Sequence, residues 1–173
     1  MILALALALL TTPQPQRTFT LPDVTVFTQE GAAVRFPDLA KNRIAVMNFV
    51  FTSCTTICPT MGATFARVQS LLGDRAGDVA LISVSIDPAN DTPERLAAWS
   101  KRLGAKPGWT LVTGSKSDID RILKAVGLYT ADPTAHAPVV LVGDAARGRW
   151  QRVDGLATPS AIIAAIDRIR GAQ

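Results

Sequence analysis

The 173-residue sequence has few of the residues from which metal and catalytic sites are usually built: two cysteines, one histidine and one tyrosine. It contains neither a P-loop nor the glycine pattern of dinucleotide-binding proteins, and it has no internal repeat. No dense basic run is interleaved with aromatic residues, so we expect no nucleic-acid partner. With 48% hydrophobic and 18% charged residues, the composition is that of a globular chain long enough for one domain with a sizeable core.

The sequence also lacks an apolar stretch of the about 20 residues that a membrane-spanning helix needs. Residues 2–10 form an uninterrupted Leu/Ala-rich run that matches the apolar core of a secretory signal peptide, although no Lys or Arg precedes it. We interpret residues 1–18 as a signal peptide or membrane-anchor remnant followed by a linker, and residues 19–173 as one folded domain. Export places that domain in an oxidising compartment, which in bacteria is the periplasm or the outer face of the inner membrane.

Both cysteines lie where an apolar run gives way to a helical pattern. Residues 44–51 are apolar except for Asn48, as in a strand that is buried on both faces. Cys54 and Cys58 follow, and Pro59 suits the first turn of a helix because its missing N–H is not needed there. We therefore expect the cysteines at a strand-to-helix junction, where the positive end of the helix dipole lowers the pKa of a thiol.

Three residues separate the two cysteines, which places their sulfur atoms about one helical turn apart. This spacing allows a redox-active pair, one shared soft metal ion or a structural disulfide, and two buried, inert thiols are a further alternative. Polar neighbours favour partial exposure of the pair: Thr52, Ser53, Thr55 and Thr56.

Strand and helix patterns alternate along the rest of the chain. We expect strands at residues 24–27, 33–36, 44–51, 79–86, 109–112, 138–142 and 148–153, and helices that begin near Pro59, Pro93, Ser115 and Pro159. Strand–helix alternation gives a mostly parallel sheet, and the last hairpin adds antiparallel strands. The sequence therefore predicts an α/β domain of the thioredoxin-like kind, with a central mixed sheet, flanking helices and an N-terminal β-hairpin extension.

His136 is the only histidine, and it precedes the strand expected at residues 138–142. That strand should lie beside the cysteine strand, so both segments would emerge at one sheet end, where open α/β sheets bind ligands. Two thiolates and one imidazole form a soft three-ligand set that suits Cu(I). Magnesium and calcium require more carboxylates than converge here, whereas zinc stays open on the ligands alone.

Two aspartates follow the strand expected at residues 79–86. Asp87 either turns the chain or brings its carboxylate near the site, where it would tune copper binding or thiol reactivity from outside the ligand set. Asp91 is interpreted as the cap of the next helix, a role that Thr92 could also fill. Met47 and Met61, two further soft donors, are interpreted as packing residues.

Taken together, these motifs resemble the Sco (SenC-type) copper proteins. The resemblance rests on Cys54-x-x-x-Cys58-Pro59 after a hydrophobic strand, on Asp87-Pro88-x-x-Asp91-Thr92-Pro93, and on a solitary His136 before a strand. It extends from about Phe19 to the C-terminus. It implies a thioredoxin fold and one copper ion per chain, as Cu(I), Cu(II) or both, bound by Cys54, Cys58 and His136.

The same resemblance implies a function and a set of partners. Sco proteins help to mature the binuclear copper centre of cytochrome c oxidase, so the expected function is that of a metallochaperone rather than an enzyme. The expected partners are the copper-site subunit of the oxidase and, beyond it, other copper chaperones or thiol reductants. The apolar run at residues 2–10 leaves membrane anchoring through the N-terminus open as the alternative to a cleaved leader.

Pro138 departs from what we expect of the family just after the histidine, because it resembles the cis-proline that faces the cysteines of thioredoxins. Only about 5–6% of X–Pro bonds in folded proteins are cis. The residue nevertheless keeps a second function open, that of a thiol–disulfide oxidoreductase. In that case Cys54 or Cys58 attacks a disulfide of an oxidase subunit or of another exported protein through a mixed disulfide.

Overall fold

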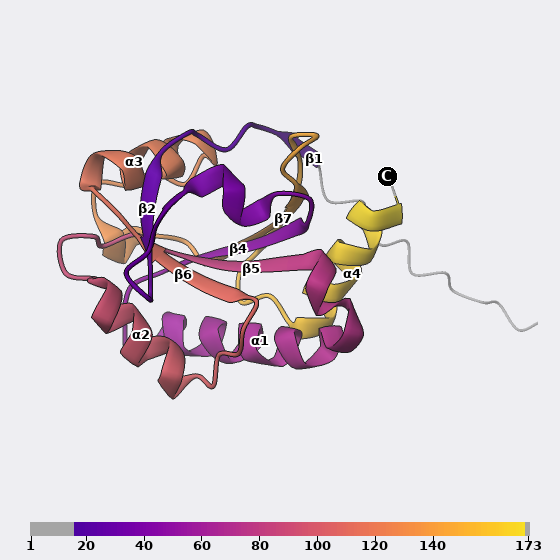
Figure 1. Cartoon of the computed structure of the whole chain (residues 1–173), viewed down its shortest axis with the longest axis horizontal. Helices are drawn as coiled ribbons and strands as arrows, with labels where there is room; N and C mark the ends of the chain where they lie inside the picture. Colours follow the sequence, from indigo (N-terminus) through magenta and orange to yellow (C-terminus); the bar gives the residue numbers. More distant parts are fainter. Residues whose placement is uncertain (1–15, 172–173) are drawn as a thin grey trace, which may run out of the picture.

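The apolar run that precedes the cysteines forms β4 (Ile44–Val50), an inner strand of the sheet in the computed structural model (Figure 1). The structure describes residues 16–171, which form an eight-stranded mixed sheet in the order β1-β8-β7-β4-β5-β6-β2-β3. All seven residues of β4 are buried, and so are all seven of the neighbouring β5 (Val79–Ser85). This double-sided burial follows from packing on both faces of the sheet and explains why neither strand alternates polar and apolar residues.

The other elements confirm the predicted α/β class with its N-terminal hairpin. The remaining strands are β1 (Gln16–Thr18), β2 (Thr25–Thr28), β3 (Ala33–Arg35), β6 (Trp109–Thr113), β7 (Val139–Asp144) and β8 (Arg149–Asp154). The helices are α1 (Ile57–Leu72), α2 (Pro93–Arg102), α3 (Lys116–Ala125) and α4 (Pro159–Gly171), with short 3₁₀ segments η1 (Phe36–Ala40), η2 (Gly73–Asp78) and η3 (Pro133–Ala135). Strands β4, β5 and β6 run parallel to one another, and the other pairings are antiparallel.

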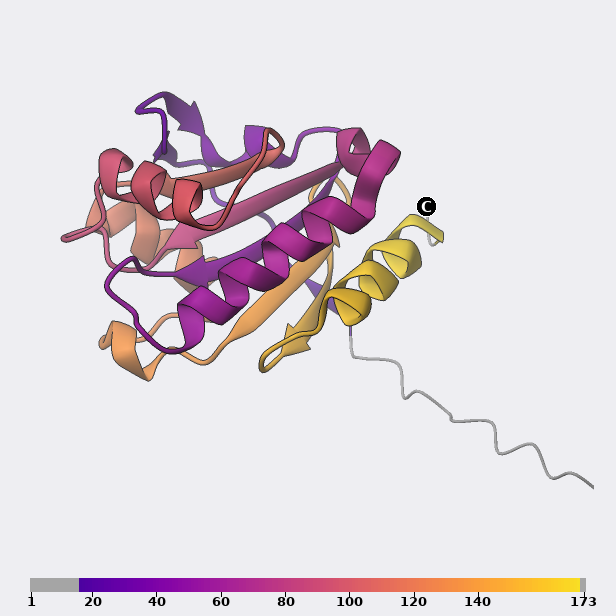
Figure 2. The same ribbon diagram turned by 90° about the horizontal axis from the view of Figure 1, so that it is seen from below.

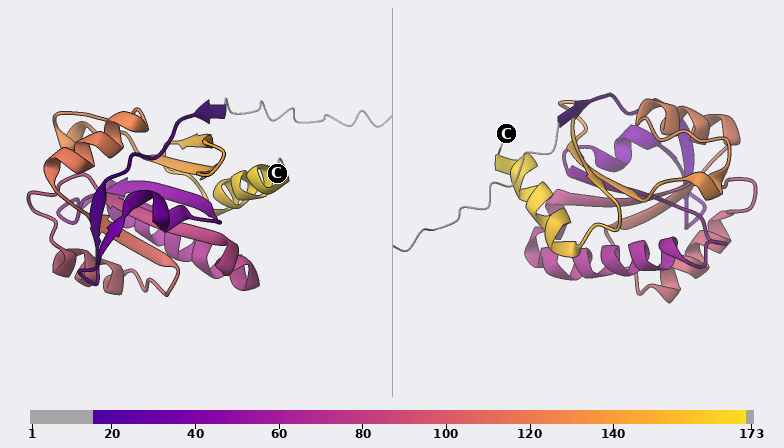
Figure 3. Two further views of the ribbon diagram at one scale, coloured as in Figure 1. Left: turned by 45° about the horizontal axis from the view of Figure 1, so that its top comes forward. Right: turned by 180° about the vertical axis from the view of Figure 1, so that it is seen from behind.

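Helices and the N-terminal segments divide the two faces of the sheet between them. Helices α1, α2 and α4 cover one face (Figure 2), and α3 and η1 cover the other (Figure 3). Each helix buries residues at helical spacing, which is the pattern that identified it in the sequence. The buried positions of α1, for example, include Cys58, Met61, Phe65, Val68 and Leu72.

Strand β1 lies earlier in the chain than predicted. Its residues Gln16–Thr18 belong to the segment interpreted as a linker, yet they pair antiparallel with Arg149–Gln151 of β8. All three side chains are exposed, so no apolar alternation marked this edge strand in the sequence. The apolar run at residues 2–10 lies outside the described residues, and within residues 16–171 none of the helices is long and apolar enough to span a bilayer.

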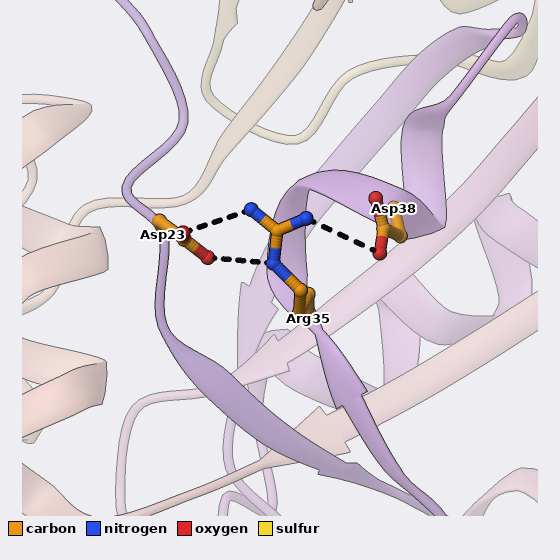
Figure 4. A network of polar contacts seen from close by, with 3 residues as sticks. All are labelled: Asp23, Arg35 and Asp38. Carbon is orange, nitrogen blue, oxygen red and sulfur yellow. Dashed lines mark hydrogen bonds and ion pairs between the residues drawn. The ribbon is translucent and has the colours of Figure 1, made fainter.

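An exposed ion-pair network connects the β2–β3 hairpin to the segments on either side of it (Figure 4). Arg35 donates through Nε and Nη2 to the carboxylate of Asp23, at 2.9 and 2.8 Å, and its Nη1 lies 3.8 Å from Asp38 Oδ2. The hydrogen bond from Arg35 lowers the pKa of Asp23. Because water and salt screen exposed pairs, the burial of Val26 and Phe36, both 0% exposed, stabilises this region more.

Gly143 on β7 lies directly against the indole ring of Trp150 on β8. A Cβ atom at position 143 would lie 2.6 Å from the backbone oxygen of Arg149 and closer still to the ring of Trp150. That ring is fully buried, donates its N–H to the carbonyl of Phe19 at 3.0 Å, and stacks on the Phe19 ring with centroids 4.8 Å apart. It therefore has no free space into which it can move.

We predict that Gly143→Ala lowers the free energy of unfolding by about 1–3 kcal/mol, because the added methyl group overpacks the β7–β8 pair. Gly77→Ala is the matched control, since a Cβ at position 77 meets no atom within 4 Å. That control should change the free energy by less than about 0.5 kcal/mol. Urea denaturation followed by circular dichroism measures both, and equal effects of the two variants would contradict the packing argument.

Candidate metal and redox site

Three chain segments meet at one end of the sheet, where β4 and β5 end and β7 begins. Val50 pairs with Ser85 at the ends of the parallel strands, and Asn48 of β4 pairs with Val140 near the start of β7. The strand after His136 therefore lies beside the cysteine strand, as predicted. Because β7 is antiparallel to β4, the chain before it emerges at the same end as the cysteine loop.

The cysteines lie at the junction of that loop with α1. Cys54 is in the loop and half-buried, and Cys58 is in the first turn of α1 with 4% of its surface exposed. The backbone N–H of Cys54 donates to the carbonyl of Phe51 at 3.2 Å, and the N–H of Cys58 donates to Cys54 Sγ at 3.4 Å. Both thiols are free. The Cys54 sulfur thus accepts a hydrogen bond from a helix N-terminus, whose N–H groups have no partner within the helix.

The two thiols differ strongly in acidity. Burial raises the pKa of Cys54, but hydrogen bonds from the backbone N–H groups of residues 56–58 and from the Cys58 thiol outweigh this effect and lower the pKa to about 7. Burial raises the pKa of Cys58 to about 12; a backbone hydrogen bond from Phe51 opposes this rise, and the charges of Cys54 and Asp91 add to it. At neutral pH about half of the accessible Cys54 thiols are therefore ionised, whereas the buried Cys58 thiol keeps its proton.

The imidazole of His136 is partly buried at the edge of the same cavity as the cysteines. Its Nε2 is buried and has no hydrogen-bond partner among the described residues, and its ring lies 5.9 Å from the ring of Phe49, centroid to centroid. Burial, followed by the positive charge of Arg152, lowers the pKa of the imidazole. The neutral form, which leaves a nitrogen lone pair available, is therefore favoured.

One cavity of about 250 Å³ adjoins all three of these side chains. Cys54, Cys58 and His136 line it together with Met61 and Pro138. Met61 also belongs to the core under α1, in line with its predicted packing role. The described residues contain no cis peptide bond, so the bond before Pro138 is trans, unlike the thioredoxin proline that it resembles in sequence.

The donor set at the cavity suits a soft ion, because thiolates and imidazole are the ligands that Cu(I) prefers. The side chains as they lie do not form a closed site, since within residues 16–171 no three His, Cys, Asp or Glu side chains are close enough to hold a metal ion. A bound ion would therefore require Cys54, Cys58 and His136 to approach one another across the cavity.

Asp87 does not line the cavity. Its carboxylate accepts hydrogen bonds from the Asn90 amide at 2.9 and 3.0 Å, and its backbone N–H donates to Ser85 Oγ at 3.2 Å. These contacts fit the interpretation that Asp87 turns the chain after β5. Its role in tuning the site stays a prediction.

Asp91 is the carboxylate that reaches the cysteine loop. It is 1% exposed and accepts hydrogen bonds from Thr52 and Ser85. Thr92 caps α2 instead, by accepting from the N–H of Arg95, so the interpretation of Asp91 as the helix cap was wrong. The local sequence could not separate these two residues, because either one is a good cap.

A thioredoxin-like sheet with a cysteine pair at the start of its first α-helix defines the class of protein: a thiol protein whose donor groups suit redox chemistry or a soft metal. The sequence matches the SCO1/SenC family over residues 13–170, and the chain belongs to this family. The predicted resemblance and fold are thereby confirmed.

Known proteins show how far the similarity extends. The SCO1 protein homolog of Bacillus subtilis is 33% identical over 115 residues, which cover 65% of this chain and 59% of that protein. The chain spans about half the length of the curated relatives it matches.

Solved structures align over most of the chain. BsSco, a member of the Sco family of cytochrome c oxidase assembly proteins in which a disulfide switch was identified, aligns with a TM-score of 0.74 at 25% identity, over 93% of this chain and 99% of that chain. Copper-bound ScoI of Bradyrhizobium japonicum aligns with a TM-score of 0.72 at 23% identity, over 87% of this chain and 99% of that chain. The second similarity shows the fold alone.

We predict that Cys54 of the reduced protein is alkylated by iodoacetamide with a pH midpoint of about 7, and that Cys58 stays unmodified through pH 9. The rate should fall as the pH drops below this midpoint, because protonation removes the nucleophilic thiolate. Mass spectrometry with fragmentation assigns the label to one cysteine. In urea both residues should react with the midpoint of an ordinary thiol, and such a midpoint for Cys54 in the folded protein would contradict the prediction.

Proposed function

We propose that the protein is a metallochaperone that binds one copper ion through Cys54, Cys58 and His136 and transfers it to the copper-site subunit of cytochrome c oxidase. The observation that supports this most directly is the single cavity that both thiols and the buried, unpartnered Nε2 of His136 share. BsSco, a member of the Sco family of cytochrome c oxidase assembly proteins, agrees with this choice of recipient.

The acidities of the donors support copper binding at neutral pH. Cys54 supplies a thiolate without a strong base, and His136 is favoured in its neutral form. Cys58 loses its proton only when a cation compensates the buried charge, so binding releases a proton and the affinity should fall in acid. Because Cys54 is half-buried rather than enclosed, thiols of a partner can reach the ion and replace the ligands one at a time.

Asp87 belongs to this proposal as a residue outside the ligand set. It follows the end of β5 and is connected to the site through Ser85, whose hydroxyl it contacts with its backbone N–H. The partners that we propose are those expected for the family: the copper-site subunit of the oxidase, other copper chaperones and thiol reductants. An exported location, in the periplasm or on the outer face of the inner membrane, completes the proposal.

A second function is supported by the contrast between the two thiols, one accessible and acidic and the other buried and weakly acidic. As an oxidoreductase, the Cys54 thiolate attacks a partner disulfide and releases one partner thiolate. Cys58 then loses its proton and attacks Cys54, which releases the second partner thiol and leaves a Cys54–Cys58 disulfide. The partner gains two electrons, and the protein needs an external thiol reductant for the next turnover.

Titration of the reduced protein with Cu(I), against a chromophoric chelator, should give one tightly bound ion per chain. Cys54→Ser and Cys58→Ser should each weaken binding by more than about 100-fold, because a thiolate is lost from a soft ligand set. Met47→Leu, which removes a sulfur atom that does not line the cavity, should bind like the wild type. Unchanged copper binding by either serine variant would exclude the proposed site.

His136→Ala separates the two functions. In a chaperone this variant should lose its bound copper during gel filtration against a competing chelator, because it keeps only two of the three ligands. In an oxidoreductase its rate of reduction of a disulfide substrate should stay within about twofold of wild type, since the exchange needs only the cysteines. If the variant kept its copper but no longer reduced disulfides, His136 would serve disulfide exchange and not copper binding, which would contradict the proposed ligand set.

A further inference from the structure

Asp91 bridges the ends of β4 and β5 directly beneath the cysteine loop. One of its carboxylate oxygens accepts from the Thr52 hydroxyl at 2.5 Å, the other accepts from the Ser85 hydroxyl at 2.6 Å, and both lie 3.1–3.2 Å from the Thr52 N–H. Ser85 is the last residue of β5, and Thr52 is the second residue after β4. The carboxylate therefore continues the contact between the two strands beyond the end of their backbone pairing.

The position of Asp91 is itself fixed by the turn that follows β5. Its backbone N–H donates to the carbonyl of Asp87 at 2.9 Å, and the N–H of Ile86 donates to the carbonyl of Val50 at 2.9 Å. The side chain is 1% exposed, so water does not compete for its oxygens. Hydrogen bonds to a buried carboxylate are short and strong, and leaving their donors unpaired is costly.

The hydrogen bonds of Thr52 restrict the backbone of the cysteine loop that follows it. Asp91 holds both the N–H and the hydroxyl of Thr52, and two residues later the N–H of Cys54 donates to the carbonyl of Phe51. These bonds fix the turn from which the Cys54 side chain extends to the N–H of Cys58. Without the Asp91 contact, Thr52 loses the partner of both its N–H and its hydroxyl, and the turn at residues 51–54 is no longer tied to β5 through Ser85.

We propose that Asp91 is a positioning residue: by holding Thr52 against Ser85, it keeps the Cys54 sulfur at the N-terminus of α1, in the orientation that the chemistry of the site requires. Asp91 makes no hydrogen bond to either cysteine and acts on Cys54 through the loop. Its negative charge separately raises the pKa of the Cys58 thiol, an effect that the Thr52 variants leave in place. The inference deepens the proposed function, because it concerns the same site, but it applies to copper binding and to disulfide exchange alike.

The test compares Asp91→Asn, Thr52→Ala and Thr52→Ser with the wild type, using the rate of Cys54 alkylation at pH 7 and the affinity for Cu(I). Asp91→Asn presents an amide N–H₂ to at least one donor of Thr52 or Ser85, which should slow alkylation about tenfold and weaken Cu(I) binding about 10–100-fold. Thr52→Ala should shift both in the same direction by a smaller factor. Thr52→Ser, which keeps the hydroxyl and the N–H, should restore wild-type values.

Asp144→Asn is the matched control for stability. Asp144 is also a buried aspartate, 7% exposed and hydrogen-bonded to Arg147, but it ends β7 at the far end of the sheet. This variant should unfold at a lower temperature and keep the wild-type alkylation rate and Cu(I) affinity. If Asp91→Asn also kept both values, or if Asp144→Asn changed them equally, Asp91 would be a structural residue only and the proposal would be overturned.

The outcomes also separate this inference from the proposed function. If the wild type failed to bind Cu(I), the copper proposal would fail, while the alkylation rates would still decide the role of Asp91. If Asp91→Asn did not fold, the comparison of Thr52→Ala with Thr52→Ser would decide it, since identical rates in those two variants would show that the contact does not position Cys54.

Discussion

The site depends on the pairing of β4 with a parallel strand on one side and an antiparallel strand on the other. The parallel partner, β5, brings Ser85 and the Asp91 turn beside the end of the cysteine strand. The antiparallel partner, β7, starts where β4 ends, so the histidine that precedes it arrives at the same edge. The same buried apolar contacts that stabilise the sheet therefore gather residues about 80 positions apart in the sequence.

Two neighbouring sulfur atoms acquire opposite properties within a single helical turn. Cys54 receives hydrogen bonds from the N-terminus of α1 and stays accessible, whereas Cys58, inside the first turn, packs into the core under the helix. A thiol of each kind suits both proposed chemistries, copper capture and disulfide exchange. Under the two proposals, a partner that accepts copper would select the first chemistry, and a partner disulfide that accepts two electrons would select the second.

Much of the fold followed from the sequence because buried strands and amphipathic helices leave strong patterns. The apolar run at residues 44–51, the prolines near the starts of α1, α2 and α4, and the paired segments 24–27 and 33–36 all predicted the elements observed. Strand β1 was missed because an exposed edge strand is held by backbone pairing, which leaves no side-chain pattern. The role of Asp91 was missed because its partner Thr52 is 39 residues away in the sequence.

The sequence by itself determined which side chains are available for chemistry, two cysteines and one histidine, and that the cysteines stand at a strand-to-helix junction. Those features are local, and short-range spacing defines them. Only the tertiary structure decided that the thiols and the imidazole share one cavity and that Cys58 is the buried thiol. It also decided that Asp91 reaches the cysteine loop instead of capping α2. Each of these depends on burial and hydrogen bonding between segments that meet only when the sheet forms.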